Sequence, residues 1–202
     1  MIIPAIIAKD FEELKSKLAQ IDGLVSWAQI DVMDGAFVPP KTWDNPADLE
    51  NISIAINLEA HLMVANPENI VDKWINSPVK RILIHYESTT HVQIESLIEK
   101  IQKSGKEVGV ALKLQTPLFV LESLIHNSKF VIRAIQLMAI SEIGYYGHPF
   151  EEKVLERIKT LREKYPDVTI SVDGGVSLEN APKIISAGAD NLVVGSAIFK
   201  SD

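Results

Sequence analysis

Apolar runs alternate with amphipathic helical segments along the chain, and this alternation predicts an α/β protein built as one (β/α)8 TIM barrel. The cores of these runs are apolar rather than alternating, as is typical of parallel strands buried on both faces. The last two runs each end in glycine, which is the pattern of the loops that hold a phosphate in such barrels. The alternative is a doubly wound sheet, but the turn at residues 7–10 has no glycine with which to hold a dinucleotide.

We predict eight strands at the apolar runs, in chain order at residues 2–7, 25–32, 54–63, 81–85, 107–112, 130–138, 169–172 and 191–194. The first of these lies in an N-terminal segment that lacks a basic leader and is too short to span a bilayer. This segment is therefore predicted to be a buried strand rather than a signal or an anchor.

Helical periodicity predicts helices at residues 11–21, 67–75, 92–103, 118–125, 151–164 and 178–187. Asp10 and Asn66 are expected to be N-caps, and Pro67 takes the favoured first helical position. Gly105 and Gly188 are placed to end helices. Because no linker or low-complexity segment interrupts the alternation, residues 1–202 are predicted to form one domain.

A complete barrel carries a closing helix after its eighth strand, and this chain has only residues 195–202 there. We therefore expect the final closing helix to be missing from this sequence, either because the barrel naturally lacks it or because the sequence is truncated before it. Its absence would leave apolar barrel surface uncovered, which favours cover by another subunit and predicts a homo-oligomer.

Composition excludes several classes of function. The net charge is −7 and there is no run of lysine or arginine, so neither nucleic acid nor a membrane surface is an expected partner. The chain has no cysteine, which excludes a disulfide framework and a thiol nucleophile and favours a cytoplasmic location. With 47% hydrophobic residues, a chain of 202 residues can bury a substantial core.

The glycine-bearing ends of the last two strands predict a phosphate site. Gly174 and Gly175 follow the seventh strand, and Gly195 and Ser196 follow the eighth. Glycine is needed there because backbone N–H groups must approach a phosphate closely, with no Cβ in the way. We therefore expect the ligand to be a phosphorylated small molecule.

Three polar residues lie within or at the ends of otherwise apolar strands: Asp31, His61 and Asp173. A buried charge costs several kcal/mol unless it is paired or bound to a metal. One such residue alone is best explained by a hydrogen-bond network in the core. Three of them, on different strands of one barrel face, predict a functional site.

Several motifs of this sequence resemble those of the ribulose-phosphate 3-epimerase family. They are QIDVMDGAFVP at residues 29–39, HLM at 61–63, NP at 66–67, VDGG at 172–175, GAD at 188–190 and GSAIF at 195–199. The resemblance runs from Pro4 to Phe199. It implies a (β/α)8 barrel of the ribulose-phosphate-binding type and an isomerase of the pentose phosphate class. Such an enzyme inverts C3 of a phosphorylated ketose, interconverting ribulose and xylulose 5-phosphates.

The resemblance also implies roles for individual residues. Asp31 and Asp173 would act as the acid and base on the two faces of an enediolate and, with His61, would bind a divalent metal, Zn2+, Fe2+ or Mn2+. Gln29 stands where the family has its first histidine ligand, so a weaker metal site is expected. The remaining expected residues are Gly147 in the phosphate site and Met33, Met63, Met138 and His148 in the substrate pocket.

Other positions depart from the family pattern. Ala5 replaces a serine, and the loop over the substrate is rewritten at residues 142–148, while the glycines of the phosphate site are retained. The preferred hypothesis is a divergent ketose-phosphate 3-epimerase, and the alternative is a phosphosugar-binding barrel with impaired catalysis. A hexulose-phosphate synthase or decarboxylase is less favoured, because that chemistry places a lysine where this chain has Asp31.

Overall fold

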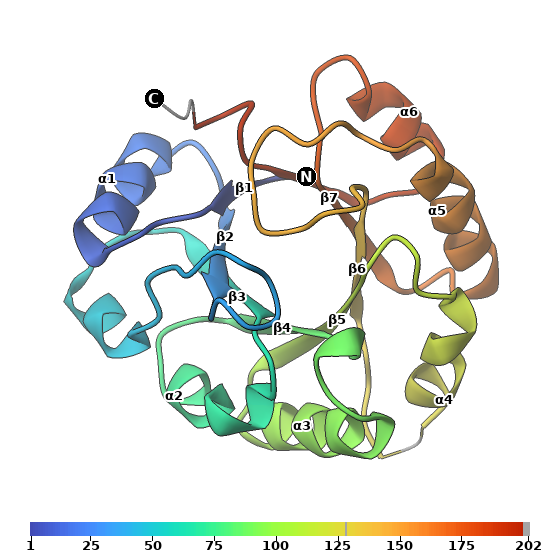
Figure 1. The fold of residues 1–202 in the computed structure, drawn as a ribbon, viewed down its shortest axis with the longest axis horizontal. Helices are drawn as coiled ribbons and strands as arrows, with labels where there is room; N and C mark the ends of the chain where they lie inside the picture. Colours follow the sequence, from blue (N-terminus) through green and yellow to red (C-terminus); the bar gives the residue numbers. More distant parts are fainter. Residues whose placement is uncertain (128, 200–202) are drawn as a thin grey trace.

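The computed structural model describes residues 1–127 and 129–199, and these form a closed barrel of eight parallel strands surrounded by helices (Figure 1). Each strand pairs with its neighbours in sequence, and β8 returns to pair with β1. The predicted (β/α)8 barrel is therefore confirmed. Within the described residues no helix is long and apolar enough to cross a membrane.

The strands lie close to the predicted positions. They are β1 (Ile2–Ile6), β2 (Trp27–Met33), β3 (Asn57–Met63), β4 (Arg81–His85), β5 (Glu107–Leu112), β6 (Ala134–Met138), β7 (Thr169–Asp173) and β8 (Asn191–Val194). The largest error is at β6, which begins four residues after the predicted start at residue 130. There the side chain of Gln102 hydrogen-bonds both the N–H and the carbonyl of Val131, so a side chain replaces the neighbouring strand as partner.

The helices also follow the prediction, but the shorter ones are irregular. The α-helices are α1 (Phe11–Ile21), α2 (Val71–Ile75), α3 (His91–Lys103), α4 (Glu122–Ile125), α5 (Lys153–Lys164) and α6 (Ala181–Ser186). The 3-10 helices are η1 (Pro46–Asn51), η2 (Pro67–Asn69), η3 (Tyr86–Ser88) and η4 (Leu118–Leu121). The single helices predicted at 67–75 and 118–125 are thus each divided into a 3-10 turn and a short α-helix.

The prediction of helix ends is correct for Asp10 and wrong for Asn66. The Asp10 carboxylate accepts a hydrogen bond from the Glu13 N–H at 2.9 Å, as an N-cap does. Asn66 makes no side-chain cap and lies in the left-handed region with φ 53°. Pro67 excludes the right-handed helical conformation from the residue before it, and asparagine tolerates the left-handed one. Asn66 therefore makes a turn rather than a cap.

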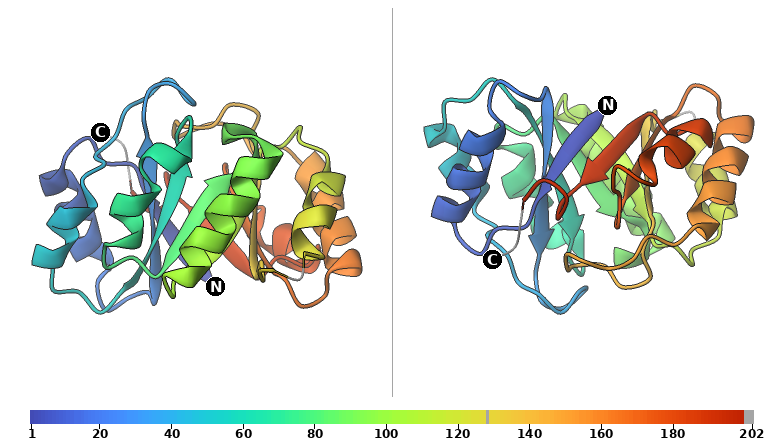
Figure 2. Two further views of the ribbon diagram at one scale, coloured as in Figure 1. Left: turned by 90° about the horizontal axis from the view of Figure 1, so that it is seen from below. Right: turned by 90° about the horizontal axis from the view of Figure 1, so that it is seen from above.

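The right-hand view of Figure 2 looks onto β1 and β8, with α1 on one side and α6 on the other. No helix within residues 1–127 and 129–199 lies across these two strands. After β8, the described residues to Phe199 form a turn, in which the Phe199 N–H bonds the Gly195 carbonyl at 2.9 Å.

The barrel interior is layered, and the layers position the site. Ile3, Ala5 and Val193 form one small apolar cluster. A second cluster contains Met33, Val38, Met63, Met138, Ile140 and Ile143, and includes the carboxyl ends of three strands. Gln29, Asp31 and Met33 alternate along β2 and so face the same side of the strand. A buried polar layer therefore lies directly below the methionines at the mouth.

Candidate active site

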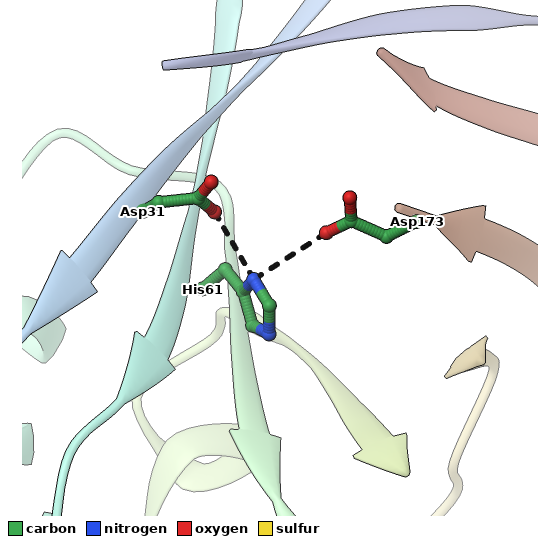
Figure 3. A group of neighbouring side chains, drawn as sticks. All are labelled: Asp31, His61 and Asp173. Atoms are coloured by element: carbon green, nitrogen blue, oxygen red, sulfur yellow. Dashed lines mark hydrogen bonds and ion pairs between the residues drawn. The ribbon is translucent and has the colours of Figure 1, made fainter. Parts of the chain in front are cut away.

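Asp31, His61 and Asp173 meet inside the barrel (Figure 3). Parallel pairing of β2 and β3 puts Asp31 beside His61, and Asp173 reaches the same point from the end of β7. His61 Nδ1 lies 3.1 Å from Asp31 Oδ1 and 3.7 Å from Asp173 Oδ2. All three residues are buried, and one donor atom from each lies within 4.8 Å of the others. This donor set suits a divalent cation.

Burial and mutual charge alter the acidity of these groups. Burial, followed by the nearby charge of Asp31, raises the pKa of Asp173 to about 7. Burial disfavours a charged His61, but the hydrogen bond and charge of Asp31, with the charge of Asp173, hold the pKa of His61 above its ordinary value. The site therefore keeps one carboxyl group ready to hold a proton near neutral pH, next to a second carboxylate.

Two glutamine side chains complete this cluster, and both are fully buried. Gln29 Nε2 donates to Asp31 Oδ1 at 2.8 Å and to Asp173 Oδ2 at 3.0 Å. Gln136 Nε2, from β6, donates to the same Asp173 oxygen at 2.8 Å. The two amides therefore hold the carboxylates in place from below. Gln136 was not among the predicted site residues, although a glutamine within an apolar strand was a signal that could have identified it.

A hydrogen-bonded chain of side chains fixes the orientation of the His61 ring. His61 Nε2 lies 2.9 Å from His85 Nε2, and His85 Nδ1 lies 3.1 Å from Glu87 Oε2. Burial lowers the pKa of His85 to about 4, so this ring is neutral and has one N–H. That N–H donates to the Glu87 carboxylate, so His85 Nε2 must accept from His61 Nε2–H. His61 consequently turns Nδ1 toward the two aspartates.

Glu87 anchors the far end of this chain. Burial opposes ionisation of Glu87, but hydrogen bonds from His85, Thr116 and the Lys113 N–H lower its pKa. The Lys113 side chain points elsewhere, because its Nζ lies 4.1 Å from the centre of the Phe37 ring. Lys113 thus contributes to the site through its backbone.

The predicted phosphate loops border the same cavity as the two aspartates. Gly174, Gly175, Gly195 and Ser196 line it, and Asp31 and Asp173 lie at its wall. Gly175 has φ +64°, and a Cβ there would lie 2.5 Å from the Phe150 nitrogen. Only glycine fits this backbone without displacement of its neighbour. A phosphate held by these loops would therefore lie beside the carboxylates.

The remaining predicted pocket residues divide into two groups. Gly147, His148, Met63 and Met138 line the cavity. Met33 does not line it: this side chain is fully buried and belongs to the apolar cluster at the mouth. Its sulfur lies 3.2 Å from where a Cβ on Gly144 would be, so Met33 supports the loop after β6.

The loop after β6 lines the same cavity with residues Gly144 to His148. Tyr146 inserts from this loop, and its hydroxyl donates to the Ala5 carbonyl at 2.8 Å and accepts from the Ile7 N–H at 3.0 Å. Burial raises the pKa of this phenol, so it remains protonated as a donor. Its ring lies against Gly195, where a Cβ would be 2.3 Å from Cε1. The tyrosine ties the loop to β1 above the phosphate site.

We expect Tyr146→Phe to release this loop. The change removes two hydrogen bonds to β1 and should lower the free energy of unfolding by about 1–2 kcal/mol. Amide hydrogen exchange should become faster at residues 142–148 and remain unchanged in β3 and β4. Equal exchange in both proteins would show that Tyr146 does not hold the loop. The exposed Tyr145→Phe is the matched control, since its hydroxyl has no hydrogen bond among the described residues.

Asp34 supports the loop after β2 rather than the cluster itself. Its carboxylate accepts from the N–H groups of Ala36, Phe37 and Ala65 at 2.8–2.9 Å. Burial opposes ionisation, but these three bonds lower the pKa of Asp34 below its ordinary value. The Asp34 carboxylate thus fixes two loops around the mouth of the barrel.

We expect Asp34→Asn to destabilise the protein by about 1 kcal/mol at pH 7, because an amide N–H2 would face one of these donors. A carboxylate with a lowered folded pKa stabilises above its unfolded pKa, and this contribution is lost as the pH falls through the folded pKa. The stability difference from wild type should therefore shrink at about pH 3. Urea unfolding at pH 7 and at about pH 3 measures this stability difference. An equal difference at the two pH values would contradict the role of Asp34 as an ionised hydrogen-bond acceptor.

Comparison with known proteins agrees with the geometry. A sequence model of the ribulose-phosphate 3 epimerase family matches residues 1–199. Ribulose-phosphate 3-epimerases from Eremothecium gossypii and Bacillus subtilis are each 32% identical, over 98% of this chain and 86% and 91% of their own length. The chloroplastic ribulose-5-phosphate-3-epimerase of Arabidopsis thaliana is 31% identical over 98% of this chain and 71% of its own.

Solved structures confirm the fold. Orotidine 5'-monophosphate decarboxylase from Sulfolobus solfataricus aligns over 99% of this chain and 90% of its own, with a TM-score of 0.66 and 13% identity. The similarity shows a shared barrel and carries no functional argument. The sequence matches cover nearly all of this chain, and the chain belongs to the ribulose-phosphate 3-epimerase family.

Proposed function

We propose that this protein is a ketose-phosphate 3-epimerase that interconverts ribulose 5-phosphate and xylulose 5-phosphate. The observation that carries the proposal is the position of Asp31 and Asp173 on β2 and β7, at the wall of a cavity that the phosphate loops also border. Inversion of a carbon next to a carbonyl needs one acid and one base on opposite faces of the intermediate. Two carboxyl groups from different strands can supply them.

In this proposal one aspartate removes the C3 proton and the other delivers a proton to the opposite face. The two carboxyl groups must then be in different protonation states when the substrate binds. The positions of Asp31 on β2 and Asp173 on β7 support this division, with one as the base and the other as the acid in one direction and the roles exchanged in the other. Gln29 and Gln136 hold the two carboxyl groups while the protons move.

Asp31, His61 and Asp173, with Gln29 as a fourth ligand, would hold a divalent cation. When bound, such a cation supplies Lewis acidity that stabilises negative charge on the carbonyl oxygen. The His61 ring is already oriented for this by His85 and Glu87. These residues therefore suit the divalent metal that the family implies.

The substrate phosphate would bind the backbone N–H groups of the loops with Gly174, Gly175, Gly195 and Ser196, joined by Gly147. Binding at that end would position the sugar carbons beneath Met63, Met138 and His148 and beside the two aspartates. The loop with Tyr146 lines this cavity, and its movement would admit a sugar phosphate and then cover it. The exclusion of water after closure would protect the intermediate.

The test is direct assay of the purified protein on ribulose 5-phosphate with Zn2+, Mn2+ or Fe2+ supplied in turn. Formation of xylulose 5-phosphate is expected with at least one of these metals. If calorimetry shows that the sugar phosphate binds but no metal supports turnover, the protein is a binding protein rather than an epimerase. The predicted cytoplasmic location and homo-oligomer remain predictions, and sedimentation of the purified chain checks the second.

A further inference from the structure

We propose that Gln29 and Gln136 bind a hard divalent cation such as Mn2+ together with Asp31, His61 and Asp173. Each amide now points its N–H2 group toward the cluster, and each would rotate to point its oxygen there when the cation binds. This inference extends the proposed function, and the role of the cation in catalysis rests on that function. It assigns Gln136 as a further metal ligand and predicts a site of four oxygens and one nitrogen.

The inward amide atom of Gln29 lies close to all three other donor atoms. Gln29 Nε2 lies 2.8 Å from Asp31 Oδ1, 3.0 Å from Asp173 Oδ2 and 3.2 Å from His61 Nδ1. Adjacent ligands of an octahedral ion with bonds of about 2.1 Å are about 3.0 Å apart. The inward end of Gln29 therefore lies where the next ligand of one coordination shell would lie.

Gln136 occupies a second such position. Its Nε2 lies 2.8 Å from Asp173 Oδ2 and 3.4 Å from His61 Nδ1. It comes from β6, between β5 and β7, whereas Gln29 comes from β2. The two amides thus approach the cluster from different strands, and five side chains enclose one point.

The outward amide oxygens of both glutamines have no hydrogen bond to lose among the described residues. Gln29 Oε1 and Gln136 Oε1 are buried, and neither has a hydrogen-bond partner among the described residues. Reversing either amide therefore breaks no hydrogen bond on its outward side. The inward contacts alone decide the orientation: two carboxylates without a cation attract the N–H2 group, whereas a cation attracts the carbonyl oxygen.

The His61 ring is already oriented as a ligand by its neighbours. The Glu87 carboxylate can only accept, so His85 donates to it through Nδ1 and accepts from His61 through Nε2. In the neutral ring this leaves the His61 Nδ1 lone pair facing Asp31 and Asp173. Nδ1 is therefore the ring nitrogen that faces both aspartates and both amides, and it is the atom that would bind the cation.

The composition of this shell sets its preference. Carboxylate and amide oxygens suit Mg2+ and Mn2+, whereas imidazole and thiolate suit Zn2+. Compared with a site that has a second imidazole, this site should therefore have a higher ratio of Mn2+ affinity to Zn2+ affinity. We expect Gln29→His to lower the ratio of Mn2+ to Zn2+ affinity by about tenfold or more.

The experiment is calorimetric titration of the whole chain with Mn2+ alone, with no sugar present. Gln136→Leu should lower Mn2+ affinity by about 10–100-fold, and Gln136→Glu, which presents only oxygens, should keep or raise it. Gln20→Leu, on the exposed face of α1, is the matched control and should bind as wild type does. Wild-type affinity in Gln136→Leu, or weaker binding by Gln136→Glu than by Gln136→Leu, would overturn the inference.

A crystal structure of the wild-type protein with Mn2+ provides a readout that does not depend on folding of the variants. The amide oxygen of each glutamine should lie within about 2.3 Å of the ion. A Gln136 amide beyond hydrogen-bond distance of the ion would overturn the assignment. Failure of the proposed function is distinguishable, because the ion would then bind through Gln136 while ribulose 5-phosphate remained unchanged.

Discussion

Replacing Asp173 by asparagine is expected to abolish epimerisation, lowering kcat by about 10²–10⁴-fold. The amide cannot accept or release the C3 proton, and Asp31 alone serves one face of the intermediate. The assay is conversion of ribulose 5-phosphate by the wild type and by Asp173→Asn with the same metal. An unchanged kcat in the variant would remove Asp173 from the proposed acid/base pair.

The fold of Asp173→Asn should be preserved, which separates chemistry from stability. An asparagine oxygen still accepts from Gln29 and Gln136, and a neutral amide replaces a buried carboxyl group that faces Asp31. Thermal unfolding of the metal-free variant should therefore occur at the wild-type temperature or above it. A large fall in that temperature would mean that lost activity reflects unfolding.

Replacing Gly175 by alanine is expected to abolish phosphate binding and to destabilise the fold by several kcal/mol. The residue has φ +64°, and its new Cβ would lie 2.5 Å from the Phe150 nitrogen and 2.8 Å from its Cα. Backbone atoms cannot move aside as a flexible side chain can, so the loop after β7 must shift. Calorimetry with ribulose 5-phosphate and urea unfolding measure the two effects.

Gly105→Ala is the matched control for this prediction. It also has a positive φ, +84°, but nothing lies within 4 Å of the new Cβ. It should therefore cost only about 1–2 kcal/mol for the left-handed backbone and leave ligand binding unchanged. Equal effects of the two substitutions would show that the contact with Phe150 is unimportant.

Most of the barrel was predictable because its determinants are local. The bounds of β4, β5, β8 and α1 are as predicted, since each is a continuous apolar run or a clear amphipathic helix with flanking signals. The start of β6 was not predictable: the apolar residues 130–132 match a strand, but the backbone of Val131 bonds the side chain of Gln102 on α3. Tertiary contacts of this kind leave no local pattern.

The site was predictable where a polar residue interrupts an apolar strand, as at Asp31 and His61. Gln136 gave the same kind of signal but no charge, and its role appears only when β6 and β7 are paired beside each other. Tyr146 gave no signal, because nothing local indicates that its hydroxyl bonds β1 more than 130 residues away. Met33 was expected in the pocket and faces the same side of β2 as Asp31, but it does not line the cavity, because it is fully buried under Gly144 of the loop after β6.

The central claim is proton transfer at C3 between two aspartates, and exchange of that proton with solvent tests it most directly. Ribulose 5-phosphate is incubated with the protein and metal in D2O and followed by NMR. Deuterium is expected at C3 of both ribulose and xylulose 5-phosphates with the wild type. With Asp173→Asn, which leaves Asp31 to serve one face, deuterium should enter at most one of the two sugars and neither should be converted into the other. A sugar phosphate that binds, yet keeps its C3 proton with every metal supplied, would contradict the account.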